Sequence, residues 1–317
     1  MSSITGSGTL SLRDNGGTVE YNLNNTSWSA VSAWPIIIVN DGINTLKVLF
    51  TTDITLTTSS QYFICGSDSI QFGDTVLNAD GSRPIIAING VGSYPGLIQN
   101  GTDVTNGYTN ISIYNLNIVS LTSSLLNNGG WIGQTRFANG ATDNLIVNCS
   151  SNGPIGNSVV WAGGIVGTYA GGSTLGSLTI RYCNNSSNTI YFAGGIVARY
   201  ASNCVIENCY SSGTISFNSG GIIGTFATNC TVTNCYSFGN MNSPASGGIF
   251  GQQAINCIAT NCYSWGSING QAGGIFGDGA NTSTAINCYS LGNIISGGGI
   301  FSSGGTEQNC YRIIRIK

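Results

Sequence analysis

Histidine is absent from this sequence, and charged side chains are scarce. Only 7% of the 317 residues are Asp, Glu, Lys or Arg, and the net charge is −3. Without histidine the common mixed cysteine–histidine zinc sites cannot form. Without a basic surface the chain has nothing to hold a nucleic-acid backbone, so nucleic-acid binding is excluded. Hydrophobic residues nevertheless make up 41%, which supplies a core and argues against disorder.

Long apolar runs are missing as well. No stretch reaches the roughly 18 apolar residues that a spanning helix needs, so no membrane span is expected. The start, MSSITGSGTLSLRDNGG, lacks the basic and apolar regions of a Sec-type signal. The sequence predicts a protein that stays where it is made or leaves by another route, such as packaging into a particle, unless a leader has been removed.

What the sequence does contain is a repeated phrase. NCYSSGTISFNSGGIIG runs from Asn208 to Gly224, and related copies begin at Asn234, Asn261 and Asn287. The cysteine of the phrase recurs at a nearly constant interval and ends with Cys310 in a last, shorter copy. A Gly-Gly element recurs in phase from Gly129 onward. A fixed period in the twenties is typical of a solenoid, whose repeats bury their apolar faces on one another.

The content of each repeat favours β-structure over helix. Every copy has several glycines and no sustained helical spacing of apolar residues. Small or apolar residues instead fall at even spacing, as inward positions of short strands do. Each coil is interpreted as three strands, G-G-I-x-G, C-x-[IVA]-x and C-Y-S-x-G-x-I, with an Asn bend between the last two. The predicted fold class is all-β: a single-stranded right-handed parallel β-helix with three short strands per coil.

Three rows of residues follow from stacking these coils. Asparagine suits a sharp bend, and stacked asparagines in successive coils can also hydrogen-bond to one another. Cysteine is small and often buried, so inward thiols are favoured over disulfides, which need β-carbons about 3.8 Å apart. The inward cysteines are predicted to be Cys204, Cys209, Cys230, Cys235, Cys257, Cys262 and Cys288. The bend asparagines are Asn208, Asn234, Asn261 and Asn287. The outward tyrosines, a candidate contact strip, are Tyr210, Tyr236, Tyr263 and Tyr289.

The sequence divides into two regions of one solenoid. Residues 1–128 lack the strict repeat and are expected to form an N-terminal cap and irregular β-helix coils. Residues 129–317 are expected to form regular coils with a charged C-terminal cap, because NCYRIIRIK ends the chain with Arg312, Arg315 and Lys317. Clustered charge is a common way to protect an open edge.

Catalytic chemistry finds little support. Polysaccharide-active β-helices need paired carboxylates, or a carboxylate with Arg or Lys, on adjacent coils. From residue 203 onward the acids are Glu207, Asp278 and Glu307, and they do not align. Asp68, Asp74 and Asp80 are spaced like loop cation ligands but are better explained as turn residues. No catalytic, cofactor-binding or metal site is predicted, and the protein is not expected to be an enzyme.

The cycle GGIIG…NCYSFGNM…GGIFG over residues 129–311 resembles the GLUG-type repeats of bacterial surface proteins and adhesins. With the cysteine before the tyrosine and the upstream TTDITLTTSSQYFICGS, it is closer in style to Cys-rich repeat proteins of large DNA viruses of amoebae. Both resemblances imply a non-enzymatic surface or particle component.

Three functions follow as hypotheses. The first is a structural component of a virus particle or surface fibre, located on the virion surface and contributing to host attachment. The second is a bacterial-type adhesin on the cell surface that binds glycans or proteins. The third is a polysaccharide-active enzyme. Expected partners are further copies of the chain, other particle or surface proteins, or a glycan.

Overall fold

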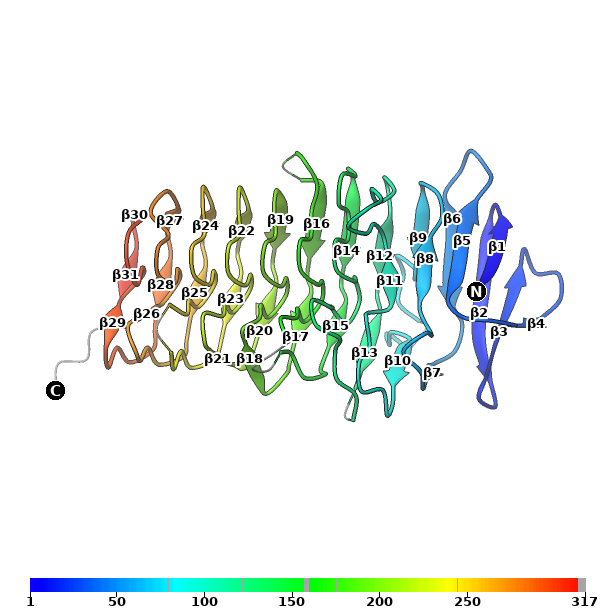
Figure 1. The fold of residues 1–317 in the computed structure, drawn as a ribbon, viewed down its shortest axis with the longest axis horizontal. Helices are drawn as coiled ribbons and strands as arrows, with labels where there is room; N and C mark the ends of the chain where they lie inside the picture. Colours follow the sequence, from blue (N-terminus) through cyan, green and yellow to red (C-terminus); the bar gives the residue numbers. More distant parts are fainter. Residues whose placement is uncertain (79, 121, 157–159, 175, 244, 313–317) are drawn as a thin grey trace.

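The structure is a computed structural model that describes residues 1–78, 80–120, 122–156, 160–174, 176–243 and 245–312. Coil follows coil along one axis, from the N-terminal end to the C-terminal end (Figure 1). The described residues form strands, bridges and turns and no helix, so no helix there is long and apolar enough to cross a membrane. The predicted parallel β-helix is confirmed.

A 13-stranded sheet, here called the long sheet, runs the length of the molecule. From its N-terminal end it contains β4 (Ser29–Ala30), β3 (Thr18–Leu23), β2 (Thr9–Asn15), β6 (Leu46–Phe50), β9 (Ile70–Phe72), β12 (Ser112–Tyr114), β14 (Asn144–Val147), β16 (Leu178–Arg181), β19 (Cys204–Glu207), β22 (Thr231–Thr233), β24 (Ile258–Thr260), β27 (Thr284–Ile286) and β30 (Thr306–Gln308). Only β2–β3 and β3–β4 are antiparallel.

A ten-stranded parallel sheet, the second sheet, lies beside it after the Asn bends. It contains β7 (Ile54–Leu56), β10 (Ile85–Ile88), β13 (Asn117–Val119), β15 (Ser150–Ser151), β17 (Asn184–Asn185), β20 (Tyr210–Ser211), β23 (Tyr236–Ser237), β25 (Tyr263–Ser264), β28 (Tyr289–Ser290) and β31 (Tyr311–Arg312).

The third side of the solenoid changes along the chain. At the N-terminal end it is a four-stranded sheet of β1 (Ser2–Gly6), β5 (Ile36–Asn40), β8 (Phe63–Cys65) and β11 (Ile98–Gln99). Two-stranded pieces occur further on, β18 (Thr189–Tyr191) with β21 (Thr214–Ser216) and β26 (Ala272–Gly273) with β29 (Gly297–Gly298).

Most of the G-G-I-x-G segments are tighter than the strand that the sequence predicts. Gly194 bridges to Gly220, and Val197 bridges to Ile223, with a bend between the two bridges. A Cβ on Gly194 would overlap the carbonyl oxygen of Val197 in its own coil. Glycine is therefore required because the backbone folds back on itself here, which leaves room for single bridges rather than a continuous strand.

The segment C-Y-S-x-G-x-I, predicted as one strand, forms two separate pieces. In the coil that begins at Cys209 it forms β20 and then, after Gly213, β21. In later coils the second piece is a column of single bridges from Ile215 to Met241, Ile268 and Ile294. A Cβ on Gly239 would overlap the carbonyl oxygen of Gly213, so close backbone packing interrupts the strand at this glycine.

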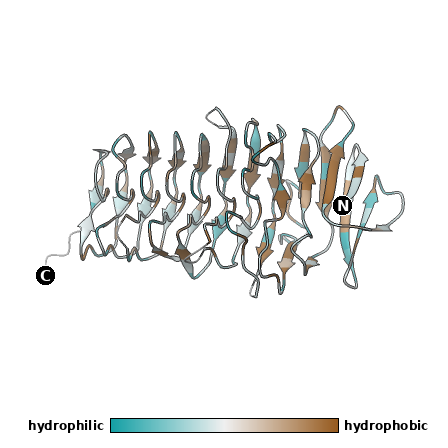
Figure 2. Cartoon of the chain, viewed as in Figure 1, coloured by the Kyte–Doolittle hydropathy of each residue, from teal (hydrophilic) through white to brown (hydrophobic). Residues whose placement is uncertain are grey.

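One hydrophobic core extends through the solenoid, from Ile4 to Phe301. Both large sheets continue past residue 128, so the irregular and regular coils share this core. The most hydrophobic strands lie in the N-terminal coils, around β5 and β6 (Figure 2).

The two ends of the solenoid are closed differently. At the N-terminal end the β2–β3 hairpin and β4 complete the long sheet. At the C-terminal end, Glu307 stands in register with inward-facing Ala285, and Arg312 stands in register with Ser290. Charged residues at inward positions of an edge strand hinder pairing with another chain. Of the predicted C-terminal cap, Arg315 and Lys317 lie outside the described residues.

Candidate functional site

The tyrosines of the repeated phrase stand in one row on the second sheet. In-register pairing places Tyr210 beside Tyr236 and Tyr236 beside Tyr263, with ring centroids 5.1 and 4.8 Å apart and nearly parallel planes. Tyr289 forms a second stack with Tyr311 at 5.7 Å. This spacing follows from the distance between paired strands. The first three rings are half-buried, whereas Tyr289 is 41% exposed.

Two further aromatic residues widen this row. Phe238 and Trp265 follow two positions after Tyr236 and Tyr263, and they are 45% and 59% exposed. The Phe238 ring meets Tyr236 edge-on at 5.2 Å. Sequence reasoning missed both, although Ser212, Phe238, Trp265 and Leu291 occupy one position of the repeat. Tyr210, Tyr236, Tyr263, Tyr289, Phe238 and Trp265 are together called the aromatic strip below.

The aromatic strip carries no charge. Residues 208–277 include no Asp, Glu, Lys or Arg. Partial burial, with the neighbouring Tyr263 and Tyr210, raises the pKa of the Tyr236 hydroxyl above its usual value. The hydroxyl is therefore neutral at physiological pH, and the surface can offer large rings with polar tips but no ionic contact.

The bend asparagines lie in a row between the two large sheets. Asn208, Asn234, Asn261 and Asn287 have φ between 50° and 54°, the left-handed conformation that asparagine tolerates. The Nδ2 of Asn234 donates to Oδ1 of Asn208 at 3.4 Å. The same bond recurs from Asn261 to Asn234 at 3.3 Å and from Asn287 to Asn261 at 3.2 Å.

The cysteines that follow these asparagines also lie in a row. The backbone N–H of Cys183 donates to Sγ of Cys209, and the N–H of Cys209 donates to Sγ of Cys235, each at 3.3 Å. The thiol of Cys209 donates to the carbonyl of Glu207 at 3.2 Å. These sulfurs thus accept backbone N–H groups at the bend, a role that sequence reasoning did not foresee.

The second set of cysteines lies before the bend, at the start of the long sheet: Cys204 begins β19, and Cys230 and Cys257 directly precede β22 and β24. Cys204, Cys230 and Cys257 are fully buried, and Ser283 continues their column. The Ser283 hydroxyl accepts the backbone N–H of Cys257 at 3.1 Å and donates to the carbonyl of Ala254 at 2.8 Å. A hydroxyl can therefore replace a thiol in this geometry.

All eleven cysteines are free, and ten of them are buried. Burial raises the pKa of the Cys209 and Cys262 thiols well above the usual value. A thiol kept protonated and away from solvent is a poor nucleophile.

The acidic residues of the regular coils are not brought together. Glu207 pairs with Arg181 at 2.7 Å, Asp278 accepts a hydrogen bond from Ser303, and Glu307 lies at the C-terminal edge. Upstream, Asp68, Asp74 and Asp80 accept backbone N–H groups of Thr109, Val76 and Ser82. In the described part of the chain, no three His, Cys, Asp or Glu side chains are grouped to hold a metal ion.

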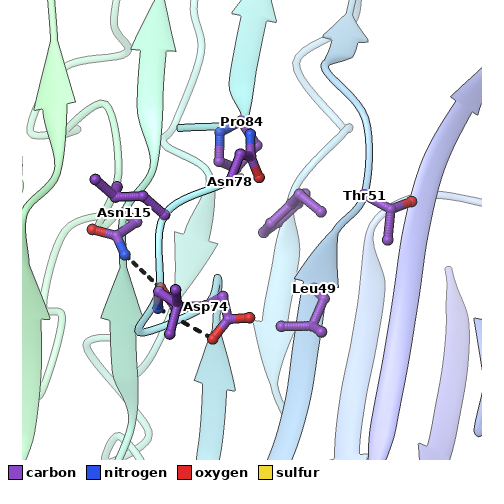
Figure 3. Close-up of a pocket in the computed structure, with 9 residues that line it drawn as sticks. Leu49, Thr51, Asp74, Asn78, Pro84 and Asn115 are labelled. Atoms are coloured by element: carbon purple, nitrogen blue, oxygen red, sulfur yellow. Dashed lines mark hydrogen bonds between the residues drawn. The ribbon is translucent and has the colours of Figure 1, made fainter. Parts of the chain in front are cut away.

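A cavity of about 270 Å³ lies beside the loop that contains Asp74 (Figure 3). Its lining combines the apolar Leu49, Phe50, Val76, Leu77 and Pro84 with the polar Thr51, Asp74, Asn78 and Asn115. Asp74 is already engaged, because its side chain accepts the N–H of Val76 and its carbonyl accepts the side-chain amide of Asn115 at 2.7 Å. This cavity offers no convergent set of free polar groups.

Comparisons with known proteins leave the family open. No family model matches the sequence, and no curated protein is similar to it. Among solved structures, the A-module of mannuronan C-5 epimerase AlgE6 from Azotobacter vinelandii is 12% identical, with 88% of this chain and 83% of that chain covered and a TM-score of 0.29. ORF18 of Geobacillus virus E2 is also 12% identical, with 90% and 55% covered and a TM-score of 0.24. Likenesses this weak carry no argument about function.

Proposed function

We propose that this protein is a non-enzymatic structural component of a virus particle or surface fibre, and that it makes lateral contacts through the aromatic strip. The observation that carries the proposal is a row of half-buried tyrosine rings, flanked by the exposed rings of Phe238 and Trp265, on a surface where residues 208–277 carry no charge. Contiguous exposed apolar surface usually marks an interaction site. A neutral surface also lacks the repulsion that keeps charged proteins apart.

The closure of the two ends supports lateral over end-to-end contact. The β2–β3 hairpin completes the N-terminal end, and Glu307 and Arg312 occupy inward positions at the other end. Another copy cannot continue the core past these charges without burying them, which is costly. The sides of the solenoid are flat by comparison, and the aromatic strip lies on one of them.

The free cysteines support assembly in a reducing compartment. Ten of the eleven are buried, and all eleven remain free thiols. Cytoplasm keeps thiols reduced, whereas secreted proteins usually form disulfides. This favours a particle component assembled inside a cell, with location on the particle surface, over a secreted bacterial-type adhesin on a cell surface.

Two experiments test the proposal. The first looks for the protein in particles or fibres, and the second replaces residues of the aromatic strip. We expect quantitative proteomics to find it in many copies in purified particles or surface fibres. Self-association of the purified protein, followed by analytical ultracentrifugation, should weaken at least about tenfold in the double variant Tyr236→Ser/Tyr263→Ser, because two large apolar contacts are lost.

The double variant Thr233→Ser/Thr260→Ser is the matched control, because it changes the long sheet of the same coils. It should associate like the unchanged protein, and circular dichroism of both variants should stay that of a β-protein. Absence from particles and fibres, or depolymerisation of a polysaccharide at enzymatic rates, would show the proposal to be wrong. Detection on cell surfaces alone would favour the adhesin.

A further inference from the structure

A second cavity, of about 370 Å³, lies far from the aromatic strip, at a corner of the coils before residue 170. Its volume falls in the range of roughly 300–1,000 Å³ that is typical of small-ligand sites. Its lining includes Gln99, Asp103, Asn128, Gln134, Arg136 and Tyr169, and the rest is threonine and glycine. No aliphatic side chain lines it, in contrast to the cavity of Figure 3.

Several polar groups in this cavity are free to bind. Among the described residues, the side chains of Gln99, Asp103, Asn128 and Arg136 have no hydrogen-bonded protein partner. The guanidinium can only donate, the carboxylate can only accept, and the two amides can do both. The charges of Arg136 and Asp103 also cancel. This set suits a neutral ligand whose groups donate and accept alike, as sugar hydroxyls do.

The walls of the cavity are held in place before any ligand arrives. The buried Asn100 closes the loop 101–107, because its side chain donates to the Tyr108 carbonyl at 3.0 Å and accepts the Tyr108 N–H at 2.6 Å. On the opposite wall, Nε2 of Gln134 donates to the Gly96 carbonyl at 2.9 Å. Groups that are already fixed lose little entropy on binding.

Arg136 is held by aromatic rings. Its guanidinium carbon lies 4.7 Å from the centre of the Tyr169 ring, and Tyr169 stacks on Tyr200 at 4.8 Å. Stacking holds the guanidinium while its N–H edge stays available for hydrogen bonds.

A left-handed backbone conformation recurs at this corner of the coils. Arg136, Tyr169 and Tyr200 have φ of 60°, 57° and 58°, where bulky side chains are uncommon. Later coils place Phe226, Gln253, Gly279 and Gly304 at this position of the repeat, with φ of 60°, 54°, 77° and 73°. The conformation therefore belongs to the coil, and it fixes where the Arg136 and Tyr169 side chains leave the backbone at the cavity wall.

We propose that this cavity binds a neutral sugar residue of a glycan. Arg136 donates to the sugar hydroxyls, Asp103 accepts from them, and the amides of Gln99 and Asn128 do both. A uronic acid could pair with Arg136 only by bringing a second carboxylate near Asp103, and this repulsion offsets the attraction, so a neutral sugar is favoured. The site goes beyond the proposed structural function, since it shares no residue with the aromatic strip.

The test is isothermal titration calorimetry of the full chain with four probes: maltohexaose, cellohexaose, mannohexaose and the acidic hexagalacturonate. We expect at least one neutral hexasaccharide to bind and hexagalacturonate to bind more weakly. Arg136→Asn and Asp103→Ala should each weaken that binding about tenfold or more, because each removes hydrogen bonds to a charged group. Asn keeps the left-handed backbone at position 136 accessible.

Three variants serve as controls and should bind like the unchanged protein. Arg181→Gln removes an arginine that pairs with Glu207, Asp74→Asn changes the cavity of Figure 3, and Tyr236→Ser/Tyr263→Ser changes the aromatic strip. Asp103 is exposed and unbonded, so Asp103→Ala keeps the test decisive even if Arg136→Asn unfolds. The proposal is overturned if no neutral probe binds at millimolar concentration, if hexagalacturonate binds best, or if the Asp103 variant binds unchanged.

Discussion

In this solenoid the long coils form cavities, whereas the short coils form flat rows of side chains. On the long sheet, the step along the chain from Phe72 to its partner Ile113 is long, and the step from Ile146 to Ile180 is shorter. The step from Ile180 to Ile206 is shorter again. Both cavities described above lie in the long coils, and the aromatic strip lies on the short ones. Chain beyond that needed for a rung forms side loops that enclose space, whereas a coil without such loops presents flat rows.

The two regions also fill their cores differently. The irregular coils turn large side chains inward, among them Phe63, Phe72 and Tyr94. On the long sheet and at the Asn bend, the regular coils turn Cys209, Ala259 and other small residues inward, held by contacts between equivalent residues one rung apart, whereas Phe250 and Phe276 stack inside another side of these coils. On the long sheet and at the bends, the first region should therefore be sensitive to lost volume, and the second to added volume and to lost hydrogen bonds.

The largest expected effect is loss of volume in the irregular coils. Phe72→Ala should lower the free energy of unfolding by about 3–5 kcal/mol, because it leaves a large cavity. Val232→Ala, an inward residue of the short coils, should cost only about 2 kcal/mol, since fewer methyl groups are removed. Urea unfolding of the two variants measures the difference, and equal losses would show that the two cores are not distinct.

The next effect tests added volume in the regular coils. Gly220→Ala should cost about 3 kcal/mol, since a Cβ there would overlap the Ile223 carbonyl and lie 2.5 Å from the Gly251 nitrogen. Gly92→Ala is the control in the irregular coils, because nothing lies within 4 Å of a Cβ at that position. It should unfold at the same urea concentration as the unchanged protein, or slightly above it. A tolerated alanine at position 220 would contradict the account of the tight corner.

Two cysteines separate hydrogen bonding from packing. Cys209→Ser should be more stable than Cys209→Ala by about 1 kcal/mol, because a hydroxyl can still accept the Cys183 N–H. Burial alone raises the pKa of Cys65, and among the described residues its sulfur has no hydrogen-bond partner. At position 65 the order of stability should reverse. Cys65→Ala should be more stable than Cys65→Ser, because serine would bury an unpaired hydroxyl. The same order of thermal midpoints at both sites would exclude hydrogen bonding as the role of the Cys209 sulfur.

The smallest expected effect is the labelling of one thiol among the eleven in the folded protein. Cys310 is the one cysteine that is not fully buried, because its coil is the last of those described. A thiol reagent should label Cys310 in the folded protein and the other ten only in denaturant. Mass spectrometry that finds disulfides, or early labelling of Cys235, would contradict the buried rows.

Much of the regular region could be predicted because its repeat is nearly exact. Asn208 and Cys209 mark a bend at a fixed phase, and alternation on either side of it separates inward Ile206 from outward Tyr210. At Gly220 the sequence predicts a strand where the structure has a tight corner, because sequence spacing does not show how closely the backbone approaches itself. Phe238 and Trp265 could have been found by comparing one column of the repeat.

The sequence by itself determined the solenoid, its period and the direction of side chains in the short coils, because local backbone preference and alternation repeat in every copy. Only the tertiary structure decided which groups meet between coils of unequal length. The cavity joins Asp103 to Arg136 across adjacent coils, and no repeat relates these positions. The sulfur of Cys209 became an acceptor for the same reason: the N–H that it satisfies belongs to another coil, and stacking alone brings the two together.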